Sequence, residues 1–296
     1  MTSPAGPGTA ARAHGGGALA SSGAPPAPPV KRPRAPIAQE PSGVHQLGGS
    51  FLQIAATVGG MAVLAGKIAA RVATLRVDGA EFMRNLYRMG VKSMPIVVVT
   101  ALFTGAIMVI QAAPLVERFG AHGLLGWGAG FGTLREIAPL LTALMINGRV
   151  GANNTAELGT MVVTEQIDAL RVLAIDPVSF LIAPRFLAMV LTLLLSVIFA
   201  DALALLGAAL TGDLLLGVAP AVFYNGLTSG LLDIGDVMSG LVKSVVFGVV
   251  LALSSCQYGL GVTGGAPGVG RAVNATVVAS AAGIFILDYF VSFTLD

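Results

Sequence analysis

Five long apolar stretches alternate with shorter polar segments along the chain. Each is close to the ~20 residues that an α-helix needs to cross the hydrocarbon core of a bilayer. No stretch contains more than an isolated charged residue or one adjacent pair. The pattern therefore predicts an all-α integral membrane protein with five transmembrane helices, at residues 94–113, 124–147, 186–210, 237–256 and 273–293.

The region before the first of these stretches has an amphipathic pattern. Apolar residues recur every three or four positions from 47 to 75, and a second short helix follows. In that helix an apolar side opposes a basic ladder: Phe82, Leu86 and Tyr87 against Arg84, Arg88 and Lys92. Such helices favour the membrane interface, although packing on a soluble partner is an alternative. We expect interfacial amphipathic helices over residues 44–93.

Residues 1–43 have a different composition. They hold nine of the 16 prolines, contain no acid before Glu40 and show no apolar period. They also lack the apolar core of a secretory signal peptide. We expect a disordered, partly polyproline tail, followed by the interfacial helices and a transmembrane domain over 94–296.

Composition supports the membrane assignment. The 296 residues are 55% hydrophobic and 11% charged, with a mean hydropathy of +0.83. A soluble domain carries roughly 25% charged residues, so a soluble enzyme is disfavoured. The net charge of +2 gives no reason to expect nucleic-acid binding. The single cysteine, Cys256, excludes an internal disulfide and a cysteine-cluster metal site, and it is expected to be a buried apolar residue.

The position of the basic residues predicts the orientation. With the N-terminus inside, the cytoplasmic segments carry ten Lys and Arg and the outer segments carry one, Arg118. The opposite orientation reverses this ratio and violates the positive-inside rule. Five spans with this bias predict an N-in, C-out topology.

Catalytic motifs are missing, and two near-matches are discounted. Gly259–Gly264 fits G-x-G-x-x-G but follows a membrane span, where a dinucleotide fold requires a strand. Gly265–Arg271 has P-loop spacing, but Arg271 replaces the lysine and Ala272 the Ser or Thr that holds Mg²⁺. We expect no catalytic residues, no metal site and no cofactor in this chain. ATP and Mg²⁺ would be bound by a partner subunit.

The segment between the second and third stretches, 148–185, is too polar to lie in lipid and is predicted to be a cytoplasmic loop. Thr164 is the expected N-cap of a short helix that ends before Asp176-Pro177. Its apolar edge consists of Ile167, Leu170 and Leu173. Such a helix suits docking into the groove of a cytoplasmic partner. Packing against its own bundle is an equal alternative from the pattern alone.

At this loop the sequence resembles the MlaE/YrbE permeases, the membrane subunits of Mla/Mce-type lipid ABC transporters. The likeness rests on the run ELGTMVVTEQIDALRVLAIDP at 157–177 and on Ala183-Pro184-Arg185. It continues in LREIAP at 134–139, GRVG at 148–151 and KSVVF at 243–247. It covers about residues 47–296 and leaves only the tail outside.

The resemblance implies an interfacial N-terminal helix, five transmembrane helices and a homodimer in the bacterial inner membrane. It also implies a cytoplasmic ABC ATPase, an Mce-domain protein on the periplasmic side and a phospholipid substrate. The family's coupling helix, which sits in a groove of the ATPase, falls on about residues 165–173. The expected coupling residues are Glu157, Glu165, Gln166, Asp168, Leu170, Arg171 and Leu173.

Ionisable residues within the spans are expected to face a cavity or a partner, because a charge in the bilayer centre costs roughly 2.5–3.5 kcal/mol or more. We hypothesise that Arg135 and Lys243 line a shared cavity and receive a lipid phosphate. The resemblance supports this, since the family's lipid cavity has basic residues at these positions. The alternative pairs Arg135 with Asp201 or Asp288. Glu136 is included among the predicted lipid-binding residues, although a hydrogen bond between helices is the favoured interpretation of this residue.

Three further positions are placed beside the acyl chains by resemblance: Met108, Gln111 and Phe119. From the pattern alone they are ordinary bundle packing.

The sequence as a whole is compatible with two classes of function. One is a non-catalytic permease subunit of an ATP-driven lipid transporter, and the other is a self-contained secondary transporter or intramembrane enzyme. The second class predicts inverted repeats or a catalytic pair in the membrane, and the sequence shows neither.

Overall fold

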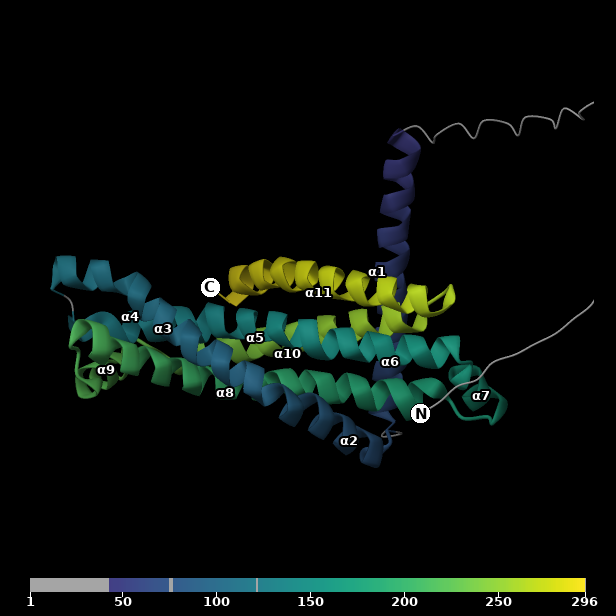
Figure 1. Ribbon diagram of the computed structural model, residues 1–296, viewed down its shortest axis with the longest axis horizontal. Coiled ribbons are helices and arrows are strands. Elements are labelled where there is room, and N and C mark those ends of the chain that lie inside the picture. The colour runs from purple at the N-terminus through teal and green to yellow at the C-terminus, as the bar shows by residue number, and fades with distance from the viewer. Residues whose placement is uncertain (1–42, 75–76, 121, 296) are drawn as a thin grey trace, which may run out of the picture. The chain divides into compact units, whose positions relative to one another are not determined.

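The computed structural model describes residues 43–74, 77–120 and 122–295, and within these ranges every regular element is helical (Figure 1). This confirms the all-α prediction. By their contacts, residues 48–296 form one unit, to which the following packing refers. The α-helices are α1 (Gly43–Ala73), α2 (Gly79–Gly90), α3 (Met94–Phe119), α4 (Leu125–Gly132), α5 (Ala138–Ile146), α6 (Ala152–Val163), α7 (Gln166–Val172), α8 (Ala183–Leu216), α9 (Pro220–Leu227), α10 (Ile234–Leu260) and α11 (Gly265–Leu295).

Short non-α turns connect several of these helices. Two are 3₁₀ turns, Val91–Ser93 and His122–Leu124. Three are π-helical turns: Thr133–Ile137 between α4 and α5, Asn147–Gly151 between α5 and α6, and Val178–Ile182 before α8. A π turn adds one residue to the helical register and is often found at functional sites. One of these turns carries Arg135 and Glu136, and another carries Arg149.

Six helical segments in the described part are long and apolar enough to cross a membrane. Five contain the predicted spans. The sixth, Ile54–Ala73, lies in the region predicted to be interfacial. Its length and composition fit a crossing as well, so its interfacial position and the N-in, C-out topology stay predictions. The predicted tail lies outside the described residues except for Gly43, where α1 begins.

The helical segment that contains the second predicted span is longer than that span. His122–Val163 is helical throughout, so residues 148–163, expected in a loop, continue the helix, and their place outside the membrane stays a prediction. Some polar residues of this helix contact neighbouring helices, whereas Arg149 and Asn153 are exposed. Asn147 Nδ2 donates to the Val277 carbonyl at 2.9 Å, and Thr155 Oγ1 lies 2.9 Å from Thr276 Oγ1. Buried polar groups with such partners are tolerated inside a helix bundle.

α2 folds because Asp78 caps it, accepting hydrogen bonds from the amides of Ala80 and Glu81. Phe82 and Leu86 pack against the main core, as the pattern predicts. Tyr87 does not, because its side chain is 63% exposed. Met83 and Val91, four residues to either side, are exposed as well. The helix therefore buries one apolar face and exposes a second.

α3 and α8 pack at very short range near the middle of the bundle. A Cβ on Gly105 would lie 1.7 Å from the Ala204 carbonyl oxygen, and one on Gly207 would lie 2.2 Å from the Leu102 carbonyl oxygen. Only glycine at these two positions permits the backbones to approach so closely. This contact fixes α3 against α8 and leaves the opposite side of α3 uncovered.

Candidate functional site

Arg135 lies on the π turn Thr133–Ile137 and points to the start of α10. Its guanidinium donates to Asp236 Oδ1 at 3.0 Å and lies 5.3 Å from the centre of the Phe131 ring. Asp236 also accepts from the Asp233 amide, completing a capping box at the N-terminus of α10. Arg135 therefore connects the second span to the beginning of the fourth.

Lys243 is fully buried among carboxylates. Its Nζ donates to Ser292 Oγ at 2.7 Å, lies 3.3 Å from Asp288 Oδ1 and forms an ion pair with Glu136. Glu136 comes from the π turn, Lys243 from α10, and the other two residues from α11. The cluster thus joins three spans, with two acids around one cation.

These contacts correct the predicted pairing. Arg135 pairs with neither Asp201 nor Asp288, because Asp236 is its partner and Asp288 belongs to Lys243. Arg135 pairs with Asp236, whereas Lys243 pairs with Glu136 and Asp288. Glu136 contacts both α10 and α11, as the helix–helix alternative predicts. That Arg135, Glu136 or Lys243 also contacts lipid stays a prediction.

Asp236 was missed as a site residue because the sequence places it in an outer loop. α10 in fact begins at Ile234, three residues before the predicted start. The available signal was the spacing Asp233-x-x-Asp236, which fits a reciprocal cap at a helix start. Asp201 remains apart from both clusters. It is buried in α8, and within the described ranges its Oδ1 has no hydrogen-bond partner.

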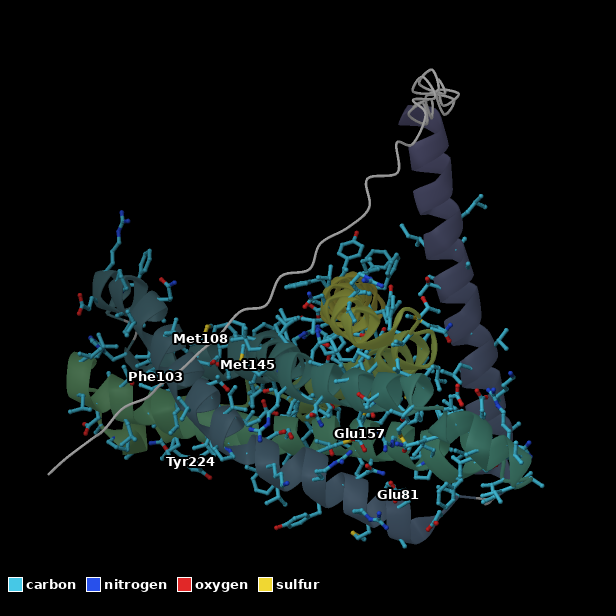
Figure 2. All side chains as sticks on the ribbon, turned by 45° about the vertical axis from the view of Figure 1, so that its right-hand side comes forward. Glu81, Phe103, Met108, Met145, Glu157 and Tyr224 are labelled. Carbon is cyan, nitrogen blue, oxygen red and sulfur yellow. The ribbon has the colours of Figure 1, made fainter. Side chains whose placement is uncertain are left out.

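A second charged cluster lies at the other end of the helices, where α2, α6 and α8 meet. Glu157 accepts from Arg185 at 2.8 Å and pairs with Arg88, and Figure 2 shows it within the bundle. The Arg185 side chain is 3% exposed and also donates to Asn154 at 3.3 Å. Glu157 was predicted to belong to the coupling set. That role stays a prediction, and its carboxylate links three helices of its own chain.

A short helix, α7, lies where the coupling helix is predicted, but its ends and its exposed face differ from the prediction. The N-cap position is Glu165, which has a left-handed φ of 58°, while Thr164 Oγ1 donates back to the Thr160 carbonyl. Ile167 is 4% exposed, so it packs inward. Val172 and Leu173 are 86% and 68% exposed. The apolar edge offered outward is therefore this pair.

The remaining predicted coupling residues are polar or half-buried. Asp168 and Arg171 form an exposed ion pair at 2.7 Å along α7. Gln166 is exposed, and Leu170 is half-buried. The segment then turns at Ala174, which has φ 58°, and Asp176 caps the following helix through the Val178 amide.

Asp176 also holds the C-terminal end of α1. Arg71 Nε lies 3.0 Å from Asp176 Oδ2, and the two side chains are each about two-fifths exposed (42% and 38%). Burial on its own would raise the pKa of Asp176. Hydrogen bonds from Ser179 and the Val178 amide, together with the charge of Arg71, outweigh this and lower the pKa below its ordinary value.

The outward side of α3 is apolar over much of its length. Phe103, Ile107 and Ile110 are at least half exposed, and Phe119 is 70% exposed. Of the positions predicted to touch acyl chains, Gln111 and Phe119 are exposed, whereas Met108 is half-buried and lies against Gly132. An apolar face of this extent requires lipid or another protein surface to cover it.

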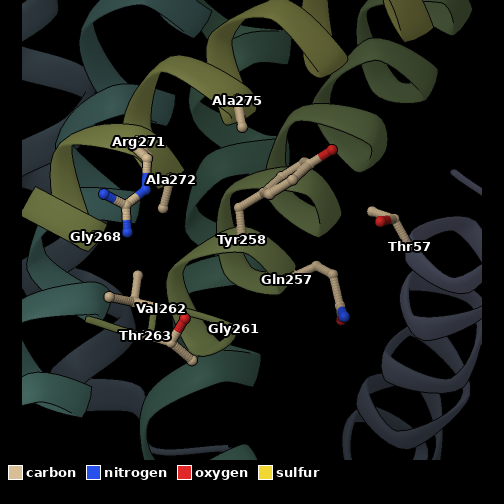
Figure 3. Close-up of a pocket in the computed structure, with 10 residues that line it drawn as sticks. All are labelled: Thr57, Gln257, Tyr258, Gly261, Val262, Thr263, Gly268, Arg271, Ala272 and Ala275. Carbon is tan, nitrogen blue, oxygen red and sulfur yellow. The ribbon is translucent and has the colours of Figure 1, made fainter. Parts of the chain in front are cut away.

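The glycine-rich segment that mimics nucleotide motifs is a turn between two membrane helices. It joins α10 to α11, and Gly264 and Gly265 adopt positive φ angles of 82° and 68°. Beside it lies a pocket of about 330 Å³ (Figure 3), in which Gln257 points toward α1 and its Thr57. The glycines are explained by the tight turn, so no phosphate loop needs to be invoked.

Comparison with known proteins gives a consistent result. The family model described as "Permease MlaE" matches residues 82–294. A probable ABC transporter permease protein of Synechocystis is 36% identical over 78% of this chain and 88% of its own length. One from Rickettsia typhi is 37% identical over 71% of this chain and 81% of its own length. The Arabidopsis protein TRIGALACTOSYLDIACYLGLYCEROL 1, chloroplastic, is 34% identical over 78% of this chain and 65% of its own length.

The matched region begins in α2 and runs through all five predicted spans, so it includes both charged clusters and α7. The named relatives are transporter permeases, which favours the first of the two predicted classes of function over a self-contained transporter or enzyme. Permease subunits of ABC transporters work with an ATPase partner. The chain belongs to the MlaE permease family and is the multi-pass membrane subunit of an ABC transporter.

Proposed function

We propose that this permease moves phospholipid between the inner membrane of a bacterium and a periplasmic Mce-type assembly, driven by ATP hydrolysis in its partner. Two copies of the chain would enclose the lipid path. The chain itself contributes no catalytic residue in this scheme. The transport cycle would couple movement of α7 to a change in the space between the two copies.

The observation that carries the ATPase part of the proposal is the exposure of α7. This helix presents Val172 and Leu173 while Ile167 anchors it to the chain's own bundle. Two positive φ angles, at Glu165 and Ala174, bound it on either side. A short helix that is anchored on one side and apolar on the other suits insertion into a groove of a partner. Movement of that partner would then pass to α6 and α8.

The lipid part has separate support. One relative carries the name of a galactolipid, trigalactosyldiacylglycerol. The exposed apolar side of α3, with Gln111 and Phe119 toward one end, would provide a surface for acyl chains. Arg135 and Lys243 are the proposed phosphate contacts. Because both already face carboxylates, a phosphate at either position would compete with Asp236 or with Glu136 and Asp288.

Co-purification tests the ATPase part. The double variant Val172→Asp/Leu173→Asp is expected to lose the ATPase and its lipid-stimulated hydrolysis, since two charges would enter an apolar groove. Leu214→Asp is the matched control: Leu214 is 82% exposed at the far end of α8. Full retention of the ATPase by the α7 variant would contradict the proposal. Equal loss in both variants would indicate a general defect and contradict it as well.

Lipid retention tests the substrate part. Arg135→Ala and Lys243→Ala are each expected to reduce the phospholipid that co-purifies with the complex. Arg118→Ala is the control, because Arg118 is an exposed cation at the end of α3. Lipid extracted from each purified complex would be quantified by mass spectrometry. If both variants retained as much phospholipid as the unaltered protein, the phosphate-contact role of these residues would be contradicted.

A further inference from the structure

A pocket of about 400 Å³ opens between the C-terminal end of α2 and the start of α6. It is separate from the charged clusters within the spans and from the exposed side of α7. Two elements build it: the end of α2 with the 3₁₀ turn after it, and the π turn Asn147–Gly151 with the first turn of α6. Its lining consists of Arg88, Met89, Lys92, Ser93, Arg149, Val150 and Asn153.

The pocket has an uncharged floor and a cationic rim. Met89, Ser93 and Val150 are buried, and the Ser93 hydroxyl already donates to the Met89 carbonyl. Lys92 and Arg149 are exposed. Arg88 and Lys92 are four residues apart in the chain, at the end of α2 and in the turn after it. The π turn brings Arg149 to the opposite wall.

Positive charge exceeds negative charge around this pocket. The one pocket-lining cation with an ion pair in the described residues is Arg88, which pairs with Glu157. Glu157 also pairs with Arg185, so its single charge is shared between two cations. Glu81, on α2, pairs with Arg84 on the outer side of that helix. No ion pair is recorded for Lys92 or Arg149 with any residue in the described ranges. The rim is therefore suited to an anion.

The chemistry of the rim selects a phosphate group. Arg149 offers a planar fork of donors, Lys92 a point charge, and Asn153 a neutral amide, and together they can satisfy several oxygens of one tetrahedral anion. The volume is of the order of a lipid headgroup rather than of a whole lipid. A carboxylate alone would use fewer of these donors.

The surface of α2 indicates where that phosphate comes from. Met83, Tyr87 and Val91 form an exposed apolar stripe at spacings of four residues, adjacent to the basic residues of the same segment. An apolar stripe beside a basic one is typical of a helix at the bilayer surface, with its cations at the level of the headgroups. The positive-inside rule assigns this end of the molecule to the cytoplasm.

We propose that the pocket lined by Arg88, Lys92 and Arg149 binds the phosphate of an anionic phospholipid in the cytoplasmic leaflet. The site lies next to the Glu157 cluster, where α2, α6 and α8 meet. A bound headgroup would add a contact between α2 and α6 beside the existing ion pair. This proposal goes beyond lipid transport, because it assigns a second lipid site that the transport path does not require.

The test measures binding of short-chain phosphatidylglycerol to the purified full chain. Lys92→Gln/Arg149→Gln should weaken this binding about tenfold or more, since two charge-assisted contacts are lost. Arg88 is left unchanged because its removal would disturb Glu157. Arg84→Gln/Arg118→Gln carries the same change of net charge outside the pocket and should bind as the unaltered protein does.

Competition assigns the source of the phosphate. If short-chain diacylglycerol fails to compete and inorganic phosphate competes only weakly, the ligand is the headgroup of a lipid. If inorganic phosphate binds as tightly as phosphatidylglycerol and is lost in the pocket variant, a soluble phosphate compound is the ligand and the lipid assignment is overturned. Equal weakening in both double variants would show a general effect of surface charge and overturn the proposal.

Two further outcomes separate this site from the proposed function. If the pocket variant keeps lipid binding but loses the ATPase on co-purification, the rim binds an acidic segment of that partner and the proposal fails. If the pocket variant loses phosphatidylglycerol while lipid transport continues, the site is confirmed as distinct from the transport path. Val172→Asp/Leu173→Asp should leave binding at this pocket unchanged.

Discussion

The two charged clusters of this permease have opposite balances. Within the spans, the buried Lys243 pairs with two carboxylates, and Arg135 pairs with a third, that of Asp236. At the end where α2, α6 and α8 meet, one carboxylate faces two guanidinium groups, and Lys92 and Arg149 lie nearby. Acids therefore dominate within the spans and cations at the end.

This difference separates cations that are balanced by carboxylates from cations that are in excess. A charge buried in a bundle costs several kcal/mol unless a partner compensates it, so the cations of the spans are already occupied. At the end of the bundle, water reduces that cost, and surplus cations can persist without partners. A phosphate at a cation within the spans would therefore have to displace a carboxylate, whereas a phosphate at Lys92 or Arg149 would not.

The strongest test removes the buried cation. Lys243→Met leaves Glu136 and Asp288 facing each other without compensation and should lower the free energy of unfolding by about 3–5 kcal/mol. The thermal unfolding midpoint of the purified protein would measure this. Adding Glu136→Gln and Asp288→Asn to the same variant should restore part of the loss. An unchanged unfolding midpoint for Lys243→Met would show that the cluster does not contribute the expected free energy of unfolding.

Neutralising the acid at the other cluster should have a smaller effect. Glu157→Gln removes the counter-charge of Arg185, which is 3% exposed, but Arg88 can turn to water. We expect a loss of about 1–3 kcal/mol, the range for hydrogen bonds to charged groups. Glu117→Gln, the same change at an exposed position of α3, is the control. A loss as large as that of Lys243→Met would contradict the difference between the clusters.

Two identical substitutions should act with opposite signs within the spans. Asp201→Asn replaces a buried acid that has no counter-cation in the described part of the chain, and should stabilise the protein by up to about 1 kcal/mol. Asp288→Asn takes a carboxylate from Lys243 and should destabilise it. Comparison of the two unfolding midpoints measures this directly. Destabilisation by Asp201→Asn would show that this acid has an unrecognised role.

Much of the fold follows from the sequence because apolar length is a strong signal in a membrane protein. Helices cover the five predicted stretches, and a short helix, α7, lies in the segment where the pattern predicts one. The continuation of the helix beyond residue 147 was missed because Asn147 and Thr155 appear polar in sequence, while their partners on α11 lie far along the chain.

The site was harder to predict because its contacts also join residues that lie far apart in the sequence. Pattern analysis found the charged residues within the five predicted spans, but pairing depends on how helices face one another. Lys243 meets residues from two other helices, and Asp236 was hidden by a helix start placed three residues late. The Arg88–Glu157 and Arg185–Glu157 pairs likewise join helices that the sequence does not relate.

The smallest predicted effect concerns Asp176, which holds α1 through Arg71. Its pKa is lowered in the folded protein, so the carboxylate stabilises the fold at neutral pH. That contribution should disappear as the pH falls through the ordinary range of an aspartate, about 3.9, toward the lower pKa of the folded state. The difference in unfolding midpoint between the unaltered protein and Asp176→Asn should therefore be largest near neutrality and close on acidification. Asp213→Asn, an exposed aspartate of α8, controls for the loss of one charge. Because the Arg71–Asp176 pair is partly exposed, salt should reduce the same difference at neutral pH. The absence of any difference at neutral pH would mean that Asp176 acts only through its cap on the Val178 amide, which an asparagine preserves, and that the ion pair to α1 adds nothing.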